Sequence, residues 1–187
     1  MNTSLHKKGF TLIDLMITLS ITGILLTIVP PSFQHLIKKT KRDTSIASMY
    51  HFYQAGRIMA IEDKKSIHFC GSNELTSCQK RWSKFAILFD DKNNDHKPSQ
   101  NEILSLQQFN DTSIQFATRA SFGKSYTILT QKGSSQLAGS IVYCGKEDLK
   151  YYQRLTWNRV GRPYVGSDKN GDGVIDGIKK YITSCRG

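Results

Sequence analysis

The sequence predicts an α+β protein in which a long N-terminal helix packs on antiparallel β-sheet. Residues 10–29 are apolar or hydroxylated almost throughout and carry one charge, at Asp14. Apolar positions then recur at helical spacing between residues 46 and 60, and short β-rich segments fill the rest of the chain. A helix followed by a run of strands is the pattern of the α+β class.

The first element is the apolar run 10–29, which follows a short basic leader ending in Lys7-Lys8-Gly9. About 20 such residues are enough to cross the bilayer core as a helix. A secretory signal has a shorter apolar region and a small-x-small cleavage site, whereas this run ends in Val29-Pro30-Pro31. We therefore expect cleavage before the run, between Gly9 and Phe10, so that the apolar helix stays attached to the product.

The helix is expected to continue from Phe10 to about Asp63. Pro30 and Pro31 predict a kink or a short melted segment, because proline removes amide donors and crowds the preceding turn. Beyond them, one apolar stripe recurs at alternating spacings of three and four; its members are Ile46, Met49, Tyr53, Gly56 and Ala60. The stripe predicts a helix face that is buried against a sheet.

The remainder of the chain supplies that sheet. Short segments rich in β-branched and aromatic residues alternate with polar turns; we expect strands at 66–70, 85–89, 103–109, 113–117, 126–130, 139–144 and 154–158. The expected organisation is a leader over 1–9, a helix over 10–63 with 10–30 in the membrane, and a β-rich domain over 64–187.

The sequence Lys8-Gly9-Phe10-Thr11-Leu12-Ile13-Asp14-Leu15 resembles the processing motif of the type IV pilin superfamily. The resemblance implies cleavage after Gly9 by a prepilin peptidase, N-methylation of Phe10, and a pilin-like fold. It also implies a single-pass inner-membrane protein with a periplasmic domain, which then joins other pilin subunits in a filament. Asp14 stands where the family almost always has glutamate.

Asp14 needs a partner, because a carboxylate inside an apolar span costs about 2.5–3.5 kcal/mol on insertion scales. Cleavage creates one, since the amine of Phe10 is cationic near neutral pH. In a filament that amine would belong to the neighbouring subunit, and the pair would set the axial register. The alternative is a plain single-pass anchor in which Asp14 lies near the lipid headgroups.

The later chain resembles the GspH/FimT group of minor pilins and pseudopilins. The resemblance rests on a cysteine-containing strand and loop, on Trp82 before residues 85–90, and on residues 155–162. It implies a structural subunit of a type II secretion pseudopilus or a type IV pilus. Some FimT proteins bind DNA in natural transformation through a G-R-x-R motif, so DNA binding is the alternative function. Here the matching residues read Gly161-Arg162-Pro163-Tyr164, without the second arginine.

All four cysteines lie beyond the apolar run, on the side that the leader charges place outside the cytoplasm. An even count in an oxidising compartment predicts two disulfides. Of the three possible pairings we expect Cys70–Cys78 and Cys144–Cys185, since each closes one structural unit. A zinc site is the alternative, but no C-x-x-C spacing supports it.

Two acidic loops have the spacing of calcium ligands. In the first, positions one, three, five and twelve of an EF-hand-type loop are Asp91, Asn93, Asp95 and Glu102, with His96 where the turn favours glycine. In the second, the candidate ligands are Asp168, Asn170, Asp172 and Asp176, and Lys179 replaces the final carboxylate. Possible Ca²⁺ is thus the one cofactor that the sequence suggests. Solvated turns are the alternative.

The formal net charge of +11 suits contact with phosphates, in lipid headgroups or in nucleic acid. Basic residues interleave with aromatic residues in the last quarter of the chain; the candidates for DNA binding are Arg154, Arg159, Arg162, Lys179 and Lys180. A solvated basic face is the alternative. The sequence holds no nucleophile elbow, H-E-x-x-H motif or phosphate-cradling glycine loop. We therefore expect a protein without catalytic activity.

Overall fold

The structure is a computed structural model, which describes residues 9–111, 113–145 and 148–185, without the side chains of residues 28–32. The predicted leader, residues 1–9, therefore lies outside the described residues except for Gly9. The chain forms two compact units, Met1–Thr40 and Lys41–Gly187.

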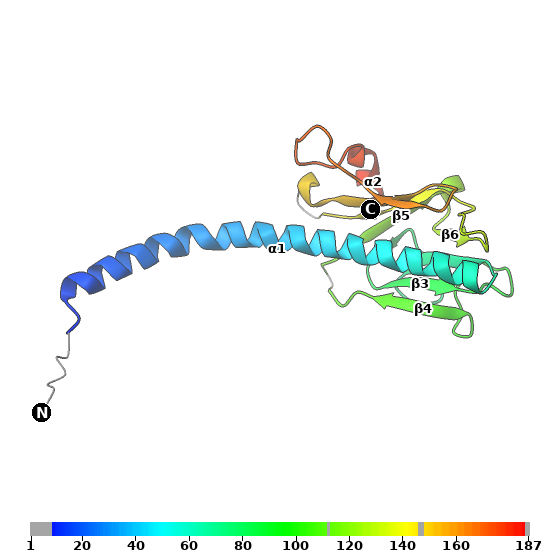
Figure 1. Ribbon diagram of the computed structural model, residues 1–187, viewed down its shortest axis with the longest axis horizontal. Helices are drawn as coiled ribbons and strands as arrows, with labels where there is room; N and C mark the ends of the chain where they lie inside the picture. Colours follow the sequence, from blue (N-terminus) through cyan, green and yellow to red (C-terminus); the bar gives the residue numbers. More distant parts are fainter. Residues whose placement is uncertain (1–8, 112, 146–147, 186–187) are drawn as a thin grey trace, which may run out of the picture. The chain divides into compact units, whose positions relative to one another are not determined.

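Helix α1 runs from Leu12 to Glu62 (Figure 1), so its end matches the prediction. Of the two outcomes predicted at Pro30 and Pro31, a kink or a short melted segment, the melted segment is wrong, because α1 is continuous across these positions. Proline removes an amide donor but fixes φ close to its helical value, and the turns on either side continue the helix. Within the described residues, no helix combines the length and the apolar character needed to span a bilayer.

The second unit contains two antiparallel sheets. The first has the strand order β4-β3-β1-β6, formed by β4 (Ile103–Gln108), β3 (Phe85–Phe89), β1 (Ile67–Ser72) and β6 (Tyr126–Leu129). The second has the order β2-β5-β7-β8-β9, formed by β2 (Arg81–Trp82), β5 (Phe116–Ala120), β7 (Gly139–Tyr143), β8 (Gln153–Trp157) and β9 (Pro163–Val165). Short helical turns lie at η1 (Ser121–Gly123), η2 (Leu149–Tyr151), η3 (Ile178–Tyr181) and α2 (Ile182–Cys185).

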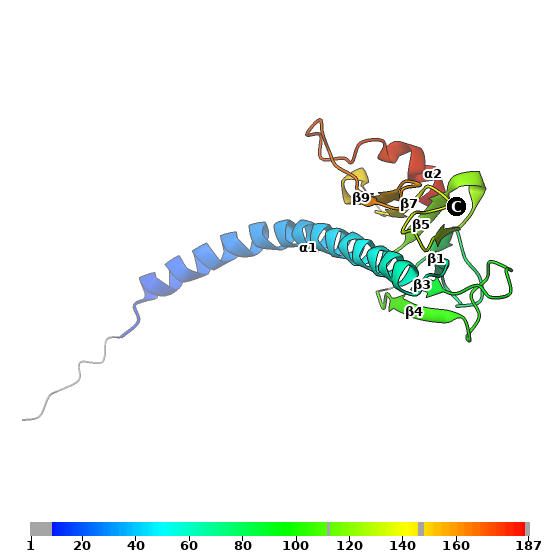
Figure 2. The same ribbon diagram turned by 45° about the vertical axis from the view of Figure 1, so that its right-hand side comes forward.

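The main core lies where the C-terminal part of α1 meets both sheets (Figure 2). The predicted helix stripe is confirmed, since Ile46, Met49, Tyr53, Gly56 and Ala60 are all buried. Tyr53 stacks on Trp157 of β8 and meets Phe69 of β1 edge-on. At Gly56 an added Cβ would lie 2.4 Å from a methyl group of Leu88 in β3, so the missing side chain lets α1 approach the first sheet closely.

Each sheet also buries part of its outer face. Every residue of β1 is buried, and Cys70 turns away from the helix into a small cluster with Ile87, Phe89 and Tyr126. On the second sheet, Val142 packs beneath the C-terminal segment, in a cluster that also contains Ile178 and Tyr181. The loop after β1 and the C-terminal segment thus cover part of the outer faces of the two sheets.

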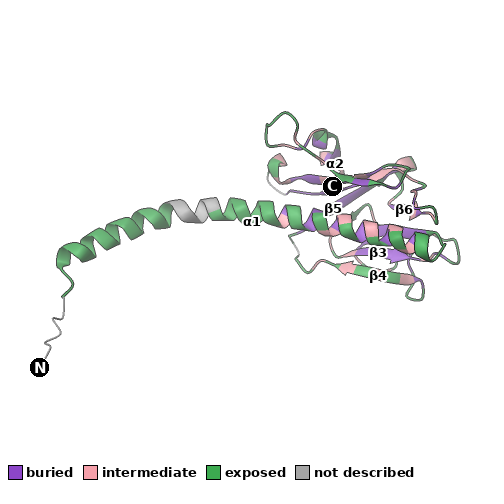
Figure 3. Cartoon of the chain, in the orientation of Figure 1, coloured by how far each residue is buried: buried purple, intermediate pink, exposed green. Residues whose placement is uncertain are grey.

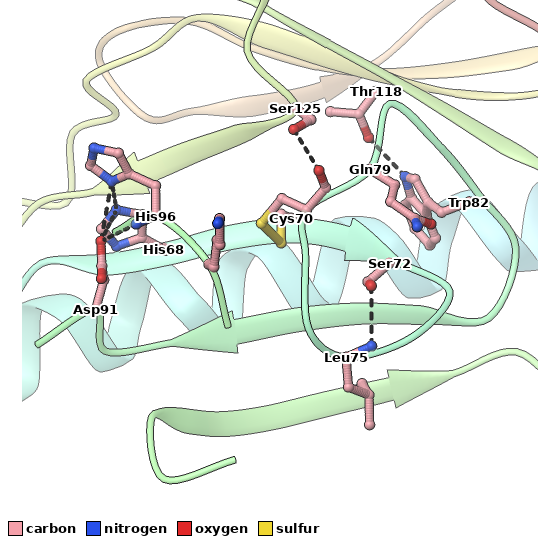
Figure 4. The surroundings of a disulfide bond; sticks show 12 residues. His68, Cys70, Ser72, Leu75, Gln79, Trp82, Asp91, His96, Thr118 and Ser125 are labelled. Carbon is pink, nitrogen blue, oxygen red and sulfur yellow. Dashed lines mark hydrogen bonds and ion pairs between the residues drawn. A yellow bond between two sulfur atoms is a disulfide. The ribbon is translucent and has the colours of Figure 1, made fainter. Parts of the chain in front are cut away.

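The two predicted disulfides link these two segments covalently to the sheets. The structure contains both Cys70–Cys78 and Cys144–Cys185, and no cysteine is free. The first ties the loop after β1 to the outer face of the first sheet (Figure 4), and the second ties α2 to the end of β7. The two pairings that the sequence analysis expected are therefore the ones present in the structure.

The predicted strands need two corrections. The strand predicted over 113–117 is partly wrong, because β5 begins only at Phe116. Ser113 instead donates its backbone N–H and its hydroxyl to the side chain of Asp111, which forms a turn. The short strands β2 and β9 are additions to the prediction, because two or three residues carry no pattern of their own and become strands only through their partners.

Candidate functional site

The start of α1 is closed by a reciprocal cap. The backbone N–H and the hydroxyl of Thr11 donate to one carboxylate oxygen of Asp14, at 3.1 and 2.7 Å, and the Asp14 N–H faces the Thr11 hydroxyl at 3.3 Å. This is a capping box, in which a residue just before the helix and an acid three positions later satisfy each other's backbone groups. The predicted assembly acid therefore also has a local role. Gly9 and Phe10 lie just before the cap and are exposed.

Among the residues that the structure describes, none covers the apolar part of the helix that follows the cap. Its large apolar residues from Leu12 to Leu26 are each more than half exposed (Figure 3). Monomeric soluble proteins rarely expose a continuous apolar surface of this extent, and such surfaces mark contact with lipid or with another protein. The described part of the apolar run thus has the character of an interaction surface.

In the first acidic loop, the carboxylates already accept hydrogen bonds. Asp91 accepts the N–H groups of Asp95 at 3.1 Å and of His96 at 3.0 Å. Glu102 accepts the Lys92 N–H and the Ser99 hydroxyl. Asp95 accepts from the Lys97 N–H, and Asn93 Oδ1 from the Asp95 N–H. The loop is therefore held in shape by its own side chains.

The second acidic loop has the same internal bonding. Asp168 accepts the N–H groups of Gly171 at 2.8 Å and of Gly173 at 2.7 Å. Asn170 and Asp172 accept N–H groups two residues ahead, and Asp176 accepts the Lys169 N–H at 3.3 Å. In both loops the first acid bonds the sixth residue, and that residue has positive φ: 58° at His96 and 81° at Gly173. Calcium binding remains a prediction for both.

A third constellation joins residues that the sequence analysis did not connect. His68, Asp91 and His96 bring one ligating atom each into a group whose members lie within 4.8 Å of one another. His68 Nε2 lies 3.1 Å from His96 Nδ1 and 3.4 Å from Asp91 Oδ2, and His96 Nδ1 lies 3.1 Å from the same oxygen (Figure 4). Burial lowers the pKa of His68, which the nearby Asp91 carboxylate opposes.

Of the basic residues proposed for DNA, the structure brings two to one place. Arg154 and Lys180 lie over the ring of Tyr181 at 5.3 and 5.2 Å, and Arg119 of β5 joins them at 6.0 Å. The other candidates are exposed: Arg159 and Arg162 in the turn between β8 and β9, and Lys179 in η3.

The second unit also has a basic cavity that the sequence did not suggest. Its volume is about 260 Å³, and its lining residues are Lys80, Arg81, Thr118, Arg119, Gly123, Lys124, Thr183 and Ser184. Half of these residues are cationic and none is acidic. Thr183 and Ser184 precede Cys185, so the second disulfide holds this wall in place. Cations and hydroxyl groups around one hollow suit an anionic ligand.

A capped and exposed apolar helix, followed by a domain of two antiparallel sheets, is the pilin-like fold that the sequence predicts. Residues 5–30 match the family model described as the prokaryotic N-terminal methylation motif. The structure is similar to that of the type IV minor pilin FimU of Pseudomonas aeruginosa PAO1. In its P21 crystal form the TM-score is 0.52 at 12% identity, over 72% of this chain and 92% of that chain.

Residues 46–161, more than half of the chain, match the family described as type II transport protein GspH. The chain belongs to the GspH family and is a minor pilin or pseudopilin. The P65 crystal form of FimU aligns over 67% of this chain and 92% of that chain, with a TM-score of 0.48 at 11% identity. A comparison with curated proteins gave no match.

Proposed function

We propose that this chain is a structural filament subunit that a prepilin peptidase cuts between Gly9 and Phe10. Residues 10–30 then anchor it in the inner membrane, residues 64–187 lie in the periplasm, and the anchors of neighbouring pilin or pseudopilin subunits pack together. One observation carries the proposal: the methylation motif leads directly into a helix whose described large apolar residues, from Leu12 to Leu26, are exposed. Lipid covers such a surface before assembly, and other subunits cover it afterwards.

Maturation is tested by mass spectrometry of the protein recovered from its own membrane. The expected chain begins at Phe10 and carries one additional methyl group. A chain that still begins at Met1, or one that begins after Val29, would contradict the proposal, because the first keeps the leader and the second has no anchor.

The proposed assembly contact is a charge pair between Asp14 and the Phe10 amine of a neighbouring subunit. In the single chain Asp14 is held by Thr11, at the end of α1 nearest the cleavage site. An acid at this end is also favourable for the helix dipole. The carboxylate is therefore positioned before assembly, and the incoming amine adds the charge that neutralises it in an apolar setting.

Three substitutions separate capping from pairing. We expect Asp14→Ala, Asp14→Asn and Asp14→Glu all to be cleaved normally, because the site lies upstream. Incorporation into filaments should fall for Ala, which removes both the cap acceptor and the charge, and for Asn, which keeps the acceptor and removes only the charge. It should persist for Glu, which keeps both. Normal incorporation of Asn together with failure of Ala would assign Asp14 to capping alone. Normal incorporation of all three would remove it from assembly.

The secretion pseudopilus and the type IV pilus use the same kind of anchor, and the proposal covers both. Deletion of the gene followed by assays of protein secretion, twitching and transformation distinguishes them. Loss of secretion alone assigns the chain to the pseudopilus, and loss of twitching assigns it to the pilus.

A second candidate function is the binding of DNA by the displayed domain. The observation that favours it is the basic cavity, where Lys80, Arg81, Arg119 and Lys124 are exposed around one hollow without an acidic neighbour in the lining. Phosphate contacts of this kind bind without sequence preference and weaken as salt rises. The turn that holds Arg159 and Arg162 is the competing location.

Paired substitutions locate the binding surface. Arg81→Ala with Lys124→Ala should weaken a mobility shift of double-stranded DNA and lower its salt slope by about 1 for each phosphate that is no longer neutralised. Arg159→Ala with Arg162→Ala tests the turn, and Lys64→Ala with Lys97→Ala removes equal charge outside the cavity. A shift that all three pairs weaken alike would indicate net charge only, and no shift of the parent protein would end the DNA hypothesis.

A further inference from the structure

The group formed by His68, Asp91 and His96 is assembled by the fold. His68 lies on β1 and pairs with Phe89 of β3, and Asp91 follows two residues later, so both side chains lie on the outer face of the first sheet. The positive φ of His96 turns the loop back over this face. Its ring stacks on Tyr126 with centroids 4.9 Å apart, and that of His68 stacks on Phe89 at 5.0 Å. Both imidazoles are therefore held in place by packing.

Two simple arrangements of protons each leave two of the three atoms in conflict. If His68 Nε2 and His96 Nδ1 both donate to Asp91 Oδ2, two N–H groups face each other at 3.1 Å. If His68 Nε2 donates to His96 Nδ1 instead, the lone pair of that nitrogen faces a carboxylate oxygen at 3.1 Å. A cation at the centre of the triangle removes the conflict, because all three atoms then act as electron-pair donors.

The dimensions fit a small d-block ion. Zinc bonds nitrogen and carboxylate oxygen at about 2.0–2.1 Å, so two ligands of a tetrahedral site lie about 3.3 Å apart. The three edges measured here are 3.1, 3.1 and 3.4 Å. Imidazole nitrogen suits zinc and its neighbours, whereas calcium and magnesium bind oxygen. The donor set therefore discriminates against the ion that the acidic loops suggest.

We propose that His68, Asp91 and His96 form a three-ligand site for Zn²⁺ or a similar divalent transition metal, with water in the fourth position. The side chain of Asp91 has no exposed surface and that of His68 is 7% exposed, whereas that of His96 is 42% exposed. The open position and the entry path therefore lie beside His96. Bound metal would fasten the turn between β3 and β4 to β1. This inference does not depend on the proposed function.

The hydrogen-bond partners of the ligands set the expected affinity for the metal. When Nε2 of His68 binds the metal, its Nδ1 carries the proton, and that atom is buried without a hydrogen-bond partner among the described residues. Loss of such an outer partner typically costs about 10–100-fold in metal affinity. We therefore expect binding that is clearly measurable but weaker than in a site with a complete outer shell.

The test is calorimetric titration of Zn²⁺ into the full chain, purified in detergent without a histidine tag and stripped with chelator. We expect one measurable site per chain that excess Ca²⁺ does not compete away, and a higher Tm with Zn²⁺. Co²⁺ in the same site should give the visible absorption of tetrahedral coordination. Because His96 is a direct ligand, His96→Ala should weaken binding by more than the roughly 10–100-fold that loss of an outer partner costs, and it should abolish the shift in Tm.

The matched control is His51→Ala, since His51 is an exposed histidine on α1 outside the group. It should bind Zn²⁺ as the parent protein does. Circular dichroism of the metal-free proteins shows whether His96→Ala folds, and that residue is exposed enough for folding to be expected. The proposal is overturned if the parent chain binds no Zn²⁺, if His96→Ala binds it equally well, or if His51→Ala weakens binding to the same extent.

Discussion

Gly71 is a sensitive position in the core, because the ring of Trp82 occupies the space of its missing side chain. A Cβ built on Gly71 would lie 1.9 Å from Trp82 Cε2 and 2.1 Å from its Nε1. Carbon atoms that touch are about 3.5–4.0 Å apart, so Gly71→Ala requires the ring to move by about 1.5–2 Å. Trp82 is 1% exposed, so this movement would push the ring against its packed neighbours.

The cost follows from the interactions that the movement breaks. Trp82 stacks on Phe116 with centroids 4.6 Å apart and donates its indole N–H to Thr118 at 2.8 Å. The stack is worth about 0.5–1.5 kcal/mol, the hydrogen bond about 1 kcal/mol, and overpacking adds about 1–3 kcal/mol. Alanine recovers about 0.5–1 kcal/mol, because glycine is costly within a strand. We expect Gly71→Ala to lower the free energy of unfolding by about 2–4 kcal/mol.

The assay is urea unfolding of the full chain, followed by the fluorescence of Trp157, which every variant retains. The control is a double-mutant cycle in which Gly71→Ala is made in a Trp82→Ala background, where the space is already empty. There the substitution should cost almost nothing. The reasoning is refuted if Gly71→Ala is within about 0.5 kcal/mol of the parent, or if it costs as much without Trp82 as with it.

Three further predictions concern other parts of the domain. Replacing Cys144 and Cys185 by Ala should cost about 4 kcal/mol, against about 2.6 kcal/mol for the other disulfide, because the separations are 41 and 8 residues; equal urea midpoints would contradict this. Burial raises the pKa of Tyr53 to about 12. The pKa of Tyr53 is near 10 in the unfolded chain, so the contribution of its neutral side chain to the free energy of unfolding is complete below pH 10 and is lost as pH rises toward 12. Tyr53→Phe should therefore flatten the loss of stability between pH 10 and 12. Calcium calorimetry should show weak binding, at about 10⁻⁴–10⁻³ M, and Asp168→Ala should remove the part that belongs to the second acidic loop; absence of heat in the parent protein at millimolar Ca²⁺ would end both calcium predictions.

The parts of the fold that the sequence predicts are those with a local pattern. The stripe from Ile46 to Ala60 is correct because one face of a helix repeats every three or four residues. Strand β3 matches its predicted bounds because five consecutive apolar residues between polar turns leave little choice. The Cys70–Cys78 disulfide is also local, since its cysteines are 8 residues apart, whereas Cys144–Cys185 joins positions 41 residues apart. Strand β5 starts later than predicted because Asp111 captures Ser113 in a turn, and a propensity scale does not contain that competition.

The unpredicted sites all depend on distant pairing. His68 and His96 are 28 residues apart, and only the register of β1 on β3 brings them together with Asp91. The one local signal for this site is His96 itself. It occupies the position where a calcium loop favours glycine, so in the sequence it is a departure from that pattern. The structure shows that this histidine adopts the left-handed conformation and directs its ring toward His68. The basic cavity is formed by chain segments near residues 80, 120 and 183, whose proximity no spacing indicates.

Strand β4 leaves one border of the first sheet open. Among the described strands, the other borders are blunted: β2 has two residues, β9 begins with Pro163, and Leu129 at the end of β6 bridges to Ser135. β4 has six residues without lysine or proline, and Leu104 and Leu106 are 42% and 44% exposed. Unpaired amides beside apolar side chains invite a second strand. Concentrated preparations of this protein should therefore self-associate through β4, and Leu104→Lys should reduce that self-association.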